Sequence, residues 1–141
     1  MNMVGIDLYL LDRASGEYER VSDGEVPRNA RWHLLWSETG DRVYFHRDEA
    51  GDEQNDIATW TRDGDTPTVV EVDGQGICMG TTHDGRYILF GSDAGEQLNL
   101  YRFDTKTGDR LQLTEYAQPV WGSEFGPEDE RIAYVTNESD T

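Results

Sequence analysis

A unit of about 45 residues recurs along this 141-residue chain and restricts the fold more than any other feature of the sequence. Each copy reads as a tight turn, an apolar strand, a polar loop and a second strand. The turn positions Gly40, Gly85 and Asp129 lie 45 and 44 residues apart. The apolar positions that follow keep the same interval: Val43, Ile88 and Ile132, then Phe45, Phe90 and Tyr134. Four short strands per ~45 residues is the period of a β-propeller blade, and a sandwich with similar strand spacing would not repeat such a unit.

The clearest copy of the unit spans residues 82–104. Its turn dipeptide is Asp84-Gly85, in which glycine can adopt the positive φ that a tight turn needs. Residues 86–90 are rich in aromatic and β-branched side chains, which favour strands. A polar loop over 92–97 then precedes the apolar positions Leu98, Leu100 and Phe103. The segment is therefore predicted to be an antiparallel hairpin.

The rest of the chain continues the same pattern of short strands and glycine turns. No window sustains apolar residues at helical spacing, so essentially no helix is expected. The phasing divides the chain into an outer half-blade at residues 6–21, complete blades at 30–72 and 77–114, and an inner half-blade at 119–136. The predicted fold is all-β: a single β-propeller segment of four-stranded antiparallel blades, with about three blade equivalents.

Three blades are too few to close a propeller, which typically has about four to eight. Two interpretations stay open. The chain is a fragment of a longer propeller, or it is half of a six-bladed ring in which the two half-blades of one copy pair with those of another.

Charge excludes several classes of partner. The chain has 29 acidic and 12 basic residues, a net charge of −17, and Lys106 is its single lysine. Nucleic acid and anionic membranes both require a basic face, so neither is expected as a partner. Such acidity is typical of proteins from a salt-loaded cytoplasm, because self-repulsion destabilises a compact state unless salt screens it. The alternative is an ordinary acidic protein; the halophilic interpretation predicts a melting temperature that rises in molar KCl.

The N-terminal residues carry no sign of export. They have no basic region, and Asp7 interrupts the first apolar run. No run approaches the ~18 apolar residues of a membrane helix. Cys78 is the single cysteine, which excludes an intrachain disulfide, and it lies in an apolar run where packing is expected. We therefore expect a soluble, cytoplasmic protein.

Motifs that carry chemistry are incomplete. Gly122-Ser123-Glu124-Phe125-Gly126 has the wrong spacing for a hydrolase nucleophile elbow, and no helix follows it. Residues 74–80 miss the dinucleotide-binding glycine pattern by one residue and run into a strand. The acidic loop at 48–53 does not fit a calcium-binding loop and is expected to be solvated.

Histidine and tryptophan residues also have structural explanations. His33, His46 and His83 are singly placed, which favours structural roles over catalysis or metal binding. Tryptophan could stack on carbohydrate, but aromatic residues of propeller strands more often fill the space between blades; the residues concerned are Trp32, Trp36, Trp60 and Trp121. We accordingly assign no catalytic residue, no cofactor-binding residue, no metal ligand and no cofactor.

The repeated unit resembles the blade of TolB-like propellers. That family's pattern is roughly Ser-Pro-Asp-Gly, a basic residue, an apolar strand, a polar loop, and then Asn/Asp-Ile/Leu-Tyr with a closing Asp. Matching segments are Asp84-Gly85-Arg86, Asn99-Leu100-Tyr101, Asp7-Leu8-Tyr9, Asp12, Ser37, Gly40 and Pro127. The chain departs from the pattern at Glu38 and His83, where proline is usual, and at Asp129, where glycine is usual.

Among proteins with such blades, the chain is most similar to the N-terminal propeller of prolyl oligopeptidase-family serine peptidases, of the dipeptidyl- or acylaminoacyl-peptidase type. The segments that carry this resemblance are Val21-Ser22-Asp23-Gly24, Arg31-Trp32, Glu53-Gln54-Asn55-Asp56-Ile57 and Thr136-Asn137-Glu138-Ser139. In that family the propeller filters substrates for a separate α/β-hydrolase domain, which holds the catalytic residues and has no counterpart here.

The resemblance implies a non-catalytic propeller segment with a substrate-gating role, so this chain is not expected to be an enzyme. Its partners would be a peptide or protein ligand, a missing hydrolase domain or a second copy. The alternative is a free-standing propeller that acts as a protein- or ligand-binding scaffold. A third class, a propeller enzyme acting at its own channel, such as a polysaccharide lyase, is disfavoured because no His/Arg/carboxylate cluster is recognisable. A Gly-x-Ser-x-Gly elbow encoded just downstream would favour the gating role.

Overall fold

A computed structural model describes residues 6–27, 33–48, 55–72, 74, 76–95 and 97–137. These residues form strands and connecting turns and contain no helix, so no helix of the described part could cross a membrane. The strands are β1 (Tyr9–Leu11), β2 (Tyr18–Arg20), β3 (Leu35–Trp36), β4 (Arg42–Arg47), β5 (Asp56–Thr61), β6 (Thr68–Val70), β7 (Gly76–Thr81), β8 (Tyr87–Ser92), β9 (Asn99–Asp104), β10 (Arg110–Gln112), β11 (Val120–Phe125) and β12 (Ile132–Thr136).

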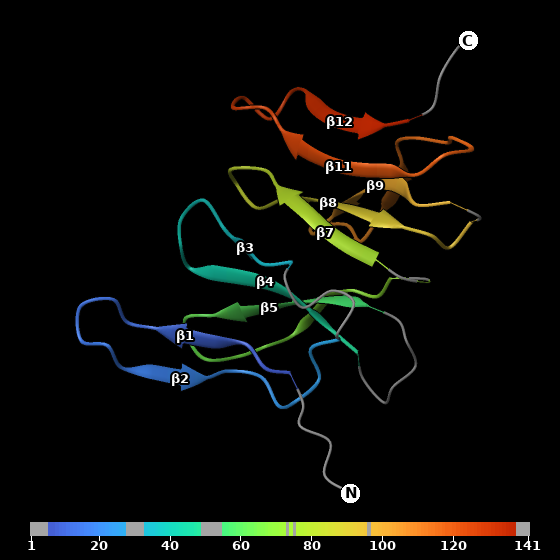
Figure 1. Ribbon diagram of the computed structural model, residues 1–141. Coiled ribbons are helices and arrows are strands. Elements are labelled where there is room, and N and C mark those ends of the chain that lie inside the picture. Colours follow the sequence, from blue (N-terminus) through green and yellow to red (C-terminus); the bar gives the residue numbers. More distant parts are fainter. Residues whose placement is uncertain are drawn as a thin grey trace, which may run out of the picture.

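The strands assemble into separate antiparallel sheets that follow one another along the chain. β1 and β2 form the first sheet, β3 to β6 the second, β7 to β10 the third, and β11 and β12 the fourth. Figure 1 shows them stacked from β1 and β2, in blue, at one end to β11 and β12, in red, at the other. The predicted all-β fold, a partial propeller of four-stranded antiparallel sheets, is confirmed.

Tight turns join the first and second strands of each sheet. Gly40 and Gly85 have φ values of 74° and 73°, a region open to glycine because it has no Cβ. Asp129 occupies the equivalent turn before β12 with φ of 60°, a conformation that aspartate tolerates better than most residues. The departure from glycine at this position therefore leaves the turn intact.

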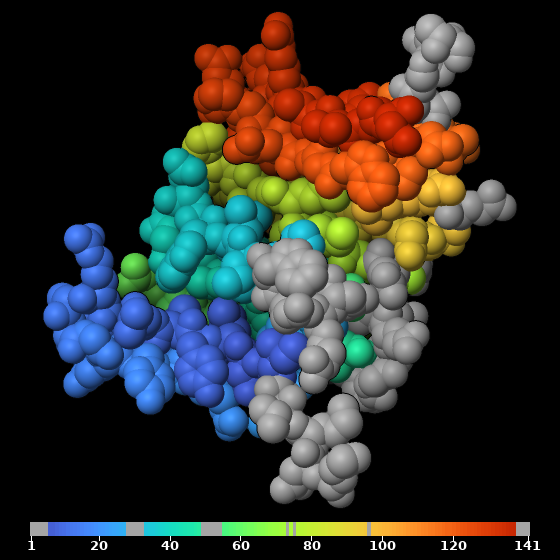
Figure 2. Space-filling view, in the orientation of Figure 1, coloured from blue at the N-terminus to red at the C-terminus, as the bar shows by residue number. Residues whose placement is uncertain are grey.

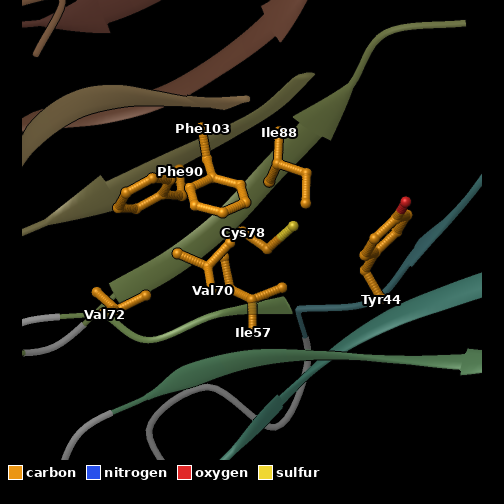
Figure 3. Close-up of a cluster of buried hydrophobic side chains, with 8 residues drawn as sticks. All are labelled: Tyr44, Ile57, Val70, Val72, Cys78, Ile88, Phe90 and Phe103. Carbon is orange, nitrogen blue, oxygen red and sulfur yellow. The ribbon is translucent and has the colours of Figure 1, made fainter. Parts of the chain in front are cut away.

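The larger hydrophobic core lies between the second and third sheets. Figure 3 shows its side chains pointing toward one another from the two sheets. They are Tyr44, Ile57, Val70, Val72, Cys78, Ile88, Phe90 and Phe103, each no more than 9% exposed. Burying a side chain such as Ile, Val or Phe contributes roughly 1.5–3 kcal/mol, so this cluster is the main attachment between the two complete sheets.

A second cluster joins the first sheet to the second. It consists of Leu8, Val26, Val43, Phe45 and Ala58. Trp60 is partly buried and packs against this cluster, as expected of an aromatic residue between blades. Trp36 and Trp121 do not follow that expectation, since they are 56% and 63% exposed. Trp36 lies on β3 and Trp121 on β11, each the first strand of its sheet.

The first strands of the sheets are irregular. β3 has only two residues, and residues 30–32, with which the predicted blade at 30–72 begins, lie outside the described part of the chain. In β7 the register with β8 shifts between Cys78 and Gly80, and in β11 the register with β12 shifts between Val120 and Gly122. Such bulges bend a strand and redirect its side chains. We call β3, β7 and β11 the inner strands; they lie next to one another and border the candidate site.

Candidate functional site

The candidate site is a cavity of about 980 Å³ on the side of the inner strands, which we call the inner-strand pocket. Trp36 of β3, Met79 of β7 and Phe125 of β11 supply apolar surface. The inner strands approach closely here: the Ser123 hydroxyl donates to the Met79 sulfur at 2.8 Å, and a Cβ at Gly80 would lie 3.7 Å from the Phe125 ring. The pocket therefore has an apolar base held by contacts between neighbouring sheets.

Charged groups from three successive turns form the rim of this pocket. Glu38 follows β3, His83 follows β7 and Asp129 follows β11. Asp129 accepts two hydrogen bonds from His83, one from the backbone N–H and one from ring Nδ1–H, each 2.9 Å long. Ring Nε2 of the same histidine lies 3.7 Å from a Glu38 carboxylate oxygen. One histidine thus connects the turns of three sheets.

The ionisation of His83 follows from these partners. The hydrogen bond with Asp129 raises the pKa of His83 above its ordinary value, and the negative charges of Asp129 and Glu38 act in the same direction. The protonated imidazolium can donate from both nitrogens, which suits carboxylates on both sides. His83 therefore has the properties of an ionic connector between sheets.

His46 occupies a different environment, in the core. It is fully buried, its Nδ1–H donates to the Asn55 carbonyl at 3.2 Å, and its Nε2 accepts the Cys78 backbone N–H at 2.9 Å. Burial lowers the pKa of His46 to about 4, so the ring is neutral at pH 7. With both nitrogens engaged by the backbone, this histidine links β4 to β7.

The remaining sequence motifs fall into strands or outside the described residues. Gly122 and Ser123 lie within β11, not at a strand-to-helix turn. The glycine-rich segment at 74–80 enters β7, and Gln75 within it is not described. Burial raises the pKa of the Cys78 thiol to about 12, so this packed cysteine is a neutral thiol at pH 7.

Some predicted features cannot be placed. Of the acidic loop at 48–53, Asp48 alone lies within the described residues, and Trp32 lies outside them. His33 is partly buried, with its ring centroid 6.1 Å from that of His46, and burial lowers its pKa. Among the residues that the structure describes, no group of three or more His, Cys, Asp and Glu side chains is arranged to hold a metal ion.

Sequence reasoning did not identify the connection between Glu38, His83 and Asp129. A signal was nevertheless present, because these three residues are among the positions at which the turns depart from the TolB-like pattern. Each of the three introduces an ionisable side chain into a turn, and the propeller fold places successive turns side by side.

Solved structures with the same arrangement of sheets are known. TolB from Acinetobacter baumannii is 20% identical, with a TM-score of 0.75; the match covers 96% of this chain and 33% of TolB. A putative TolB from Agrobacterium tumefaciens is 22% identical, with a TM-score of 0.72 and coverage of 96% and 47%. The Pyrococcus horikoshii acylaminoacyl peptidase is 20% identical, with a TM-score of 0.60 and coverage of 92% and 19%.

No family sequence profile and no curated protein sequence matches the chain. The chain spans 33% and 47% of the length of the two TolB proteins, and the match to the peptidase is confined to its propeller part. At identities of this size the likeness defines a fold and not an activity. The chain is similar in structure both to TolB propellers and to the propeller domains of prolyl oligopeptidase-type peptidases, and its fold is that of a TolB-like β-propeller segment.

Proposed function

We propose that this chain is a non-catalytic scaffold that binds an extended peptide, or a flexible segment of another protein, in the inner-strand pocket. The observation that carries the proposal is the pocket itself. At about 980 Å³, it has the size of a cleft that encloses several side chains and combines an apolar base with a charged rim. Exposed tryptophan at such a site supplies large contact area, as in many binding surfaces.

The charge of the pocket indicates the class of peptide. Glu38, Glu124 and Asp129 outnumber the basic lining residues, His83 and Arg131, and the whole chain carries a net charge of −17. A field of this sign attracts basic partners and repels acidic ones. The peptide that fits best therefore combines apolar side chains with arginine or lysine.

Binding without catalysis is supported by what the polar side chains contact. The Ser123 hydroxyl donates to the Met79 sulfur, and His83 bonds Asp129. A serine nucleophile would instead need its hydroxyl within hydrogen-bond reach of a histidine base. Within the described part of the pocket, His83 and Ser123 do not form that pair.

A second candidate is the gating role, in which the pocket filters peptides for a hydrolase domain. It is supported by the match to an acylaminoacyl peptidase over 92% of this chain. A sequence encoding a Gly-x-Ser-x-Gly elbow directly downstream of this chain would favour gating, whereas its absence there would favour a free-standing scaffold.

The proposal is tested by calorimetric titration with two short synthetic peptides, one alternating leucine with arginine and the other leucine with glutamate, at about 0.1 M KCl, where the Debye length of about 10 Å leaves the charge of the pocket effective. The basic peptide is expected to bind at least about tenfold more tightly, equivalent to about 1.4 kcal/mol. Trp36→Ala should weaken its binding about tenfold, because Trp36 lines the pocket. Trp121→Ala is the matched control, since Trp121 is similarly exposed but does not line this pocket.

Assays for hydrolase activity test the non-catalytic part of the proposal. Incubation with aminoacyl- or prolyl-amide substrates is expected to release no product, and a fluorophosphonate serine-hydrolase probe is expected to leave the chain unlabelled. Labelling of any serine, or failure of both peptides to bind, would contradict the proposed function.

A further inference from the structure

The two end sheets of this chain each have an unpaired strand edge. β12 pairs with β11 on one side, and β1 pairs with β2 on one side; among the described residues no strand occupies the other side of either. Figure 2 shows that these sheets, red and blue, lie at opposite ends of the molecule. Exposed edges of this kind are templates for pairing with a further strand.

β12 carries the apolar residues of a buried strand, but its side chains are largely exposed. It occupies the same repeat position as β8, in which Leu89 and Phe90 are 0% and 1% exposed. In β12, Tyr134 and Val135 are 41% and 64% exposed. Apolar surface of this kind, concentrated on an unpaired strand, marks an interaction site.

β1 presents the complementary surface. Leu11 is 69% exposed, whereas Phe103, at the equivalent position of β9, is 9% exposed. A groove of about 680 Å³ runs beside β1, with Leu10 and Leu11 on one side and Leu34, Trp36 and Val43 of the second sheet on the other. This is the place that the first two strands of a complete sheet would fill.

The repeat also fixes how β12 would lie against β1. In the third sheet Ile88 is opposite Phe103, and Phe90 is opposite Tyr101, with their rings stacked at 5.5 Å. Transferred by the repeat interval, this register places Tyr134 opposite Tyr9, Val135 opposite Leu8 and Arg131 opposite Asp12. The register therefore pairs two aromatic rings, two aliphatic side chains and two opposite charges, each a favourable cross-strand combination.

We propose that a second copy of this chain supplies the missing strands: β12 of each copy pairs with β1 of the other, antiparallel and in the register of β8 with β9. Two copies then provide four complete sheets and two composite ones, six in all, within the usual range of about four to eight blades. The contact repeats by two-fold symmetry and closes the ring, so that the edges of β12 and β1 are both paired. This interface goes beyond the proposed peptide binding and does not depend on it.

Light scattering coupled to size-exclusion chromatography in molar KCl tests the interface. The expected particle has about twice the 16.0 kDa chain mass. Val135→Lys should convert it to a folded monomer, because Val135 is exposed in the single chain but would be buried in the composite sheet. Leu111→Lys is the matched control: Leu111 is 49% exposed on β10, the outermost strand of a complete sheet, and its variant should remain a dimer.

Disulfide trapping tests the register. The Tyr9→Cys/Tyr134→Cys variant should form a covalent dimer on mild oxidation, because directly opposite Cβ atoms lie about 4.5–5.5 Å apart. Tyr9→Cys/Ala133→Cys should not, because Ala133 would face the other side of the sheet. A compact, folded monomer overturns the proposal, as expected if a further segment of a longer chain normally fills these edges. Open-ended or polydisperse assemblies also overturn it, as does equal trapping of the two cysteine pairs.

Discussion

β8 and β12 have nearly the same pattern of residues and opposite surroundings. Ile88, Leu89 and Phe90 are almost completely inaccessible in β8, which has strands on both sides and a sheet packed against its face. Their repeat equivalents in β12 are half-buried or exposed, because β12 has a free edge and lies in the end sheet of the stack (Figure 1). The comparison shows that burial in a propeller is a property of neighbouring strands, so the same residue type contributes very different stability at equivalent positions.

The largest expected effect comes from truncating the aromatic residue of each strand. Phe90→Ala removes a 1% exposed ring that stacks on Tyr101, and such core truncations cost about 3–5 kcal/mol. Tyr134→Ala should cost about 1 kcal/mol or less in a chain kept monomeric by Val135→Lys, because Tyr134 is 41% exposed. Urea unfolding followed by circular dichroism measures both. Equal losses would show that the two strands do not differ in burial.

A second comparison concerns the position held by Gly91 in β8 and by Val135 in β12. A Cβ at Gly91 would lie 2.9 Å from the Met79 methyl and 3.2 Å from a Leu98 methyl, so Gly91→Val overpacks the site and should cost about 1–3 kcal/mol. Gly91→Ala should cost less, because the end of the Met79 side chain can move. Val135→Ala should change the free energy of unfolding by less than about 0.5 kcal/mol in the single chain. A Gly91→Val chain as stable as the parent would contradict the close packing.

In β4 the residue at the same repeat position as Gly91 and Val135 is His46. This residue makes the free energy of unfolding depend on pH. Burial lowers the pKa of His46 to about 4, so protonation favours the unfolded chain. The contribution of neutral His46 to the free energy of unfolding is fully present above the ordinary histidine pKa of about 6.5. It declines as the pH falls, by about 2 kcal/mol between pH 6.5 and 5. Urea unfolding across this range should show the decline in the parent and a weaker one in His46→Gln. An NMR titration in which the His46 ring protonates near pH 6.5 would refute the argument.

Sequence analysis predicted the sheets more completely than it predicted the pocket. The repeat predicted strands such as β4, β5, β8 and β9, because alternating apolar residues and turn glycines indicate a strand within a short segment of sequence. It did not give the exposure of Trp36, which depends on a neighbouring sheet and not on the strand containing it. The contact of His83 with Asp129 spans 46 residues, and the departures from the turn pattern do not by themselves show that these two side chains meet.

The smallest expected effect is at the turns that distinguish the fourth sheet from the others, where Asp129 replaces the glycine found at positions 40 and 85. Because the hydrogen bond with Asp129 raises the pKa of His83, the ionic connection contributes stability that is complete below about pH 6.5 and is lost as the pH rises through the folded-state pKa. His83→Gln should therefore lower the melting temperature slightly at pH 6 and leave it unchanged at pH 9. Because His83 is exposed to solvent, the difference at pH 6 should shrink in molar KCl, as expected of a screened surface ion pair. Asp129→Gly restores the glycine of the other turns and should remove the same pH-dependent difference while keeping the turn. A His83→Gln effect of equal size at both pH values would instead indicate packing and not charge.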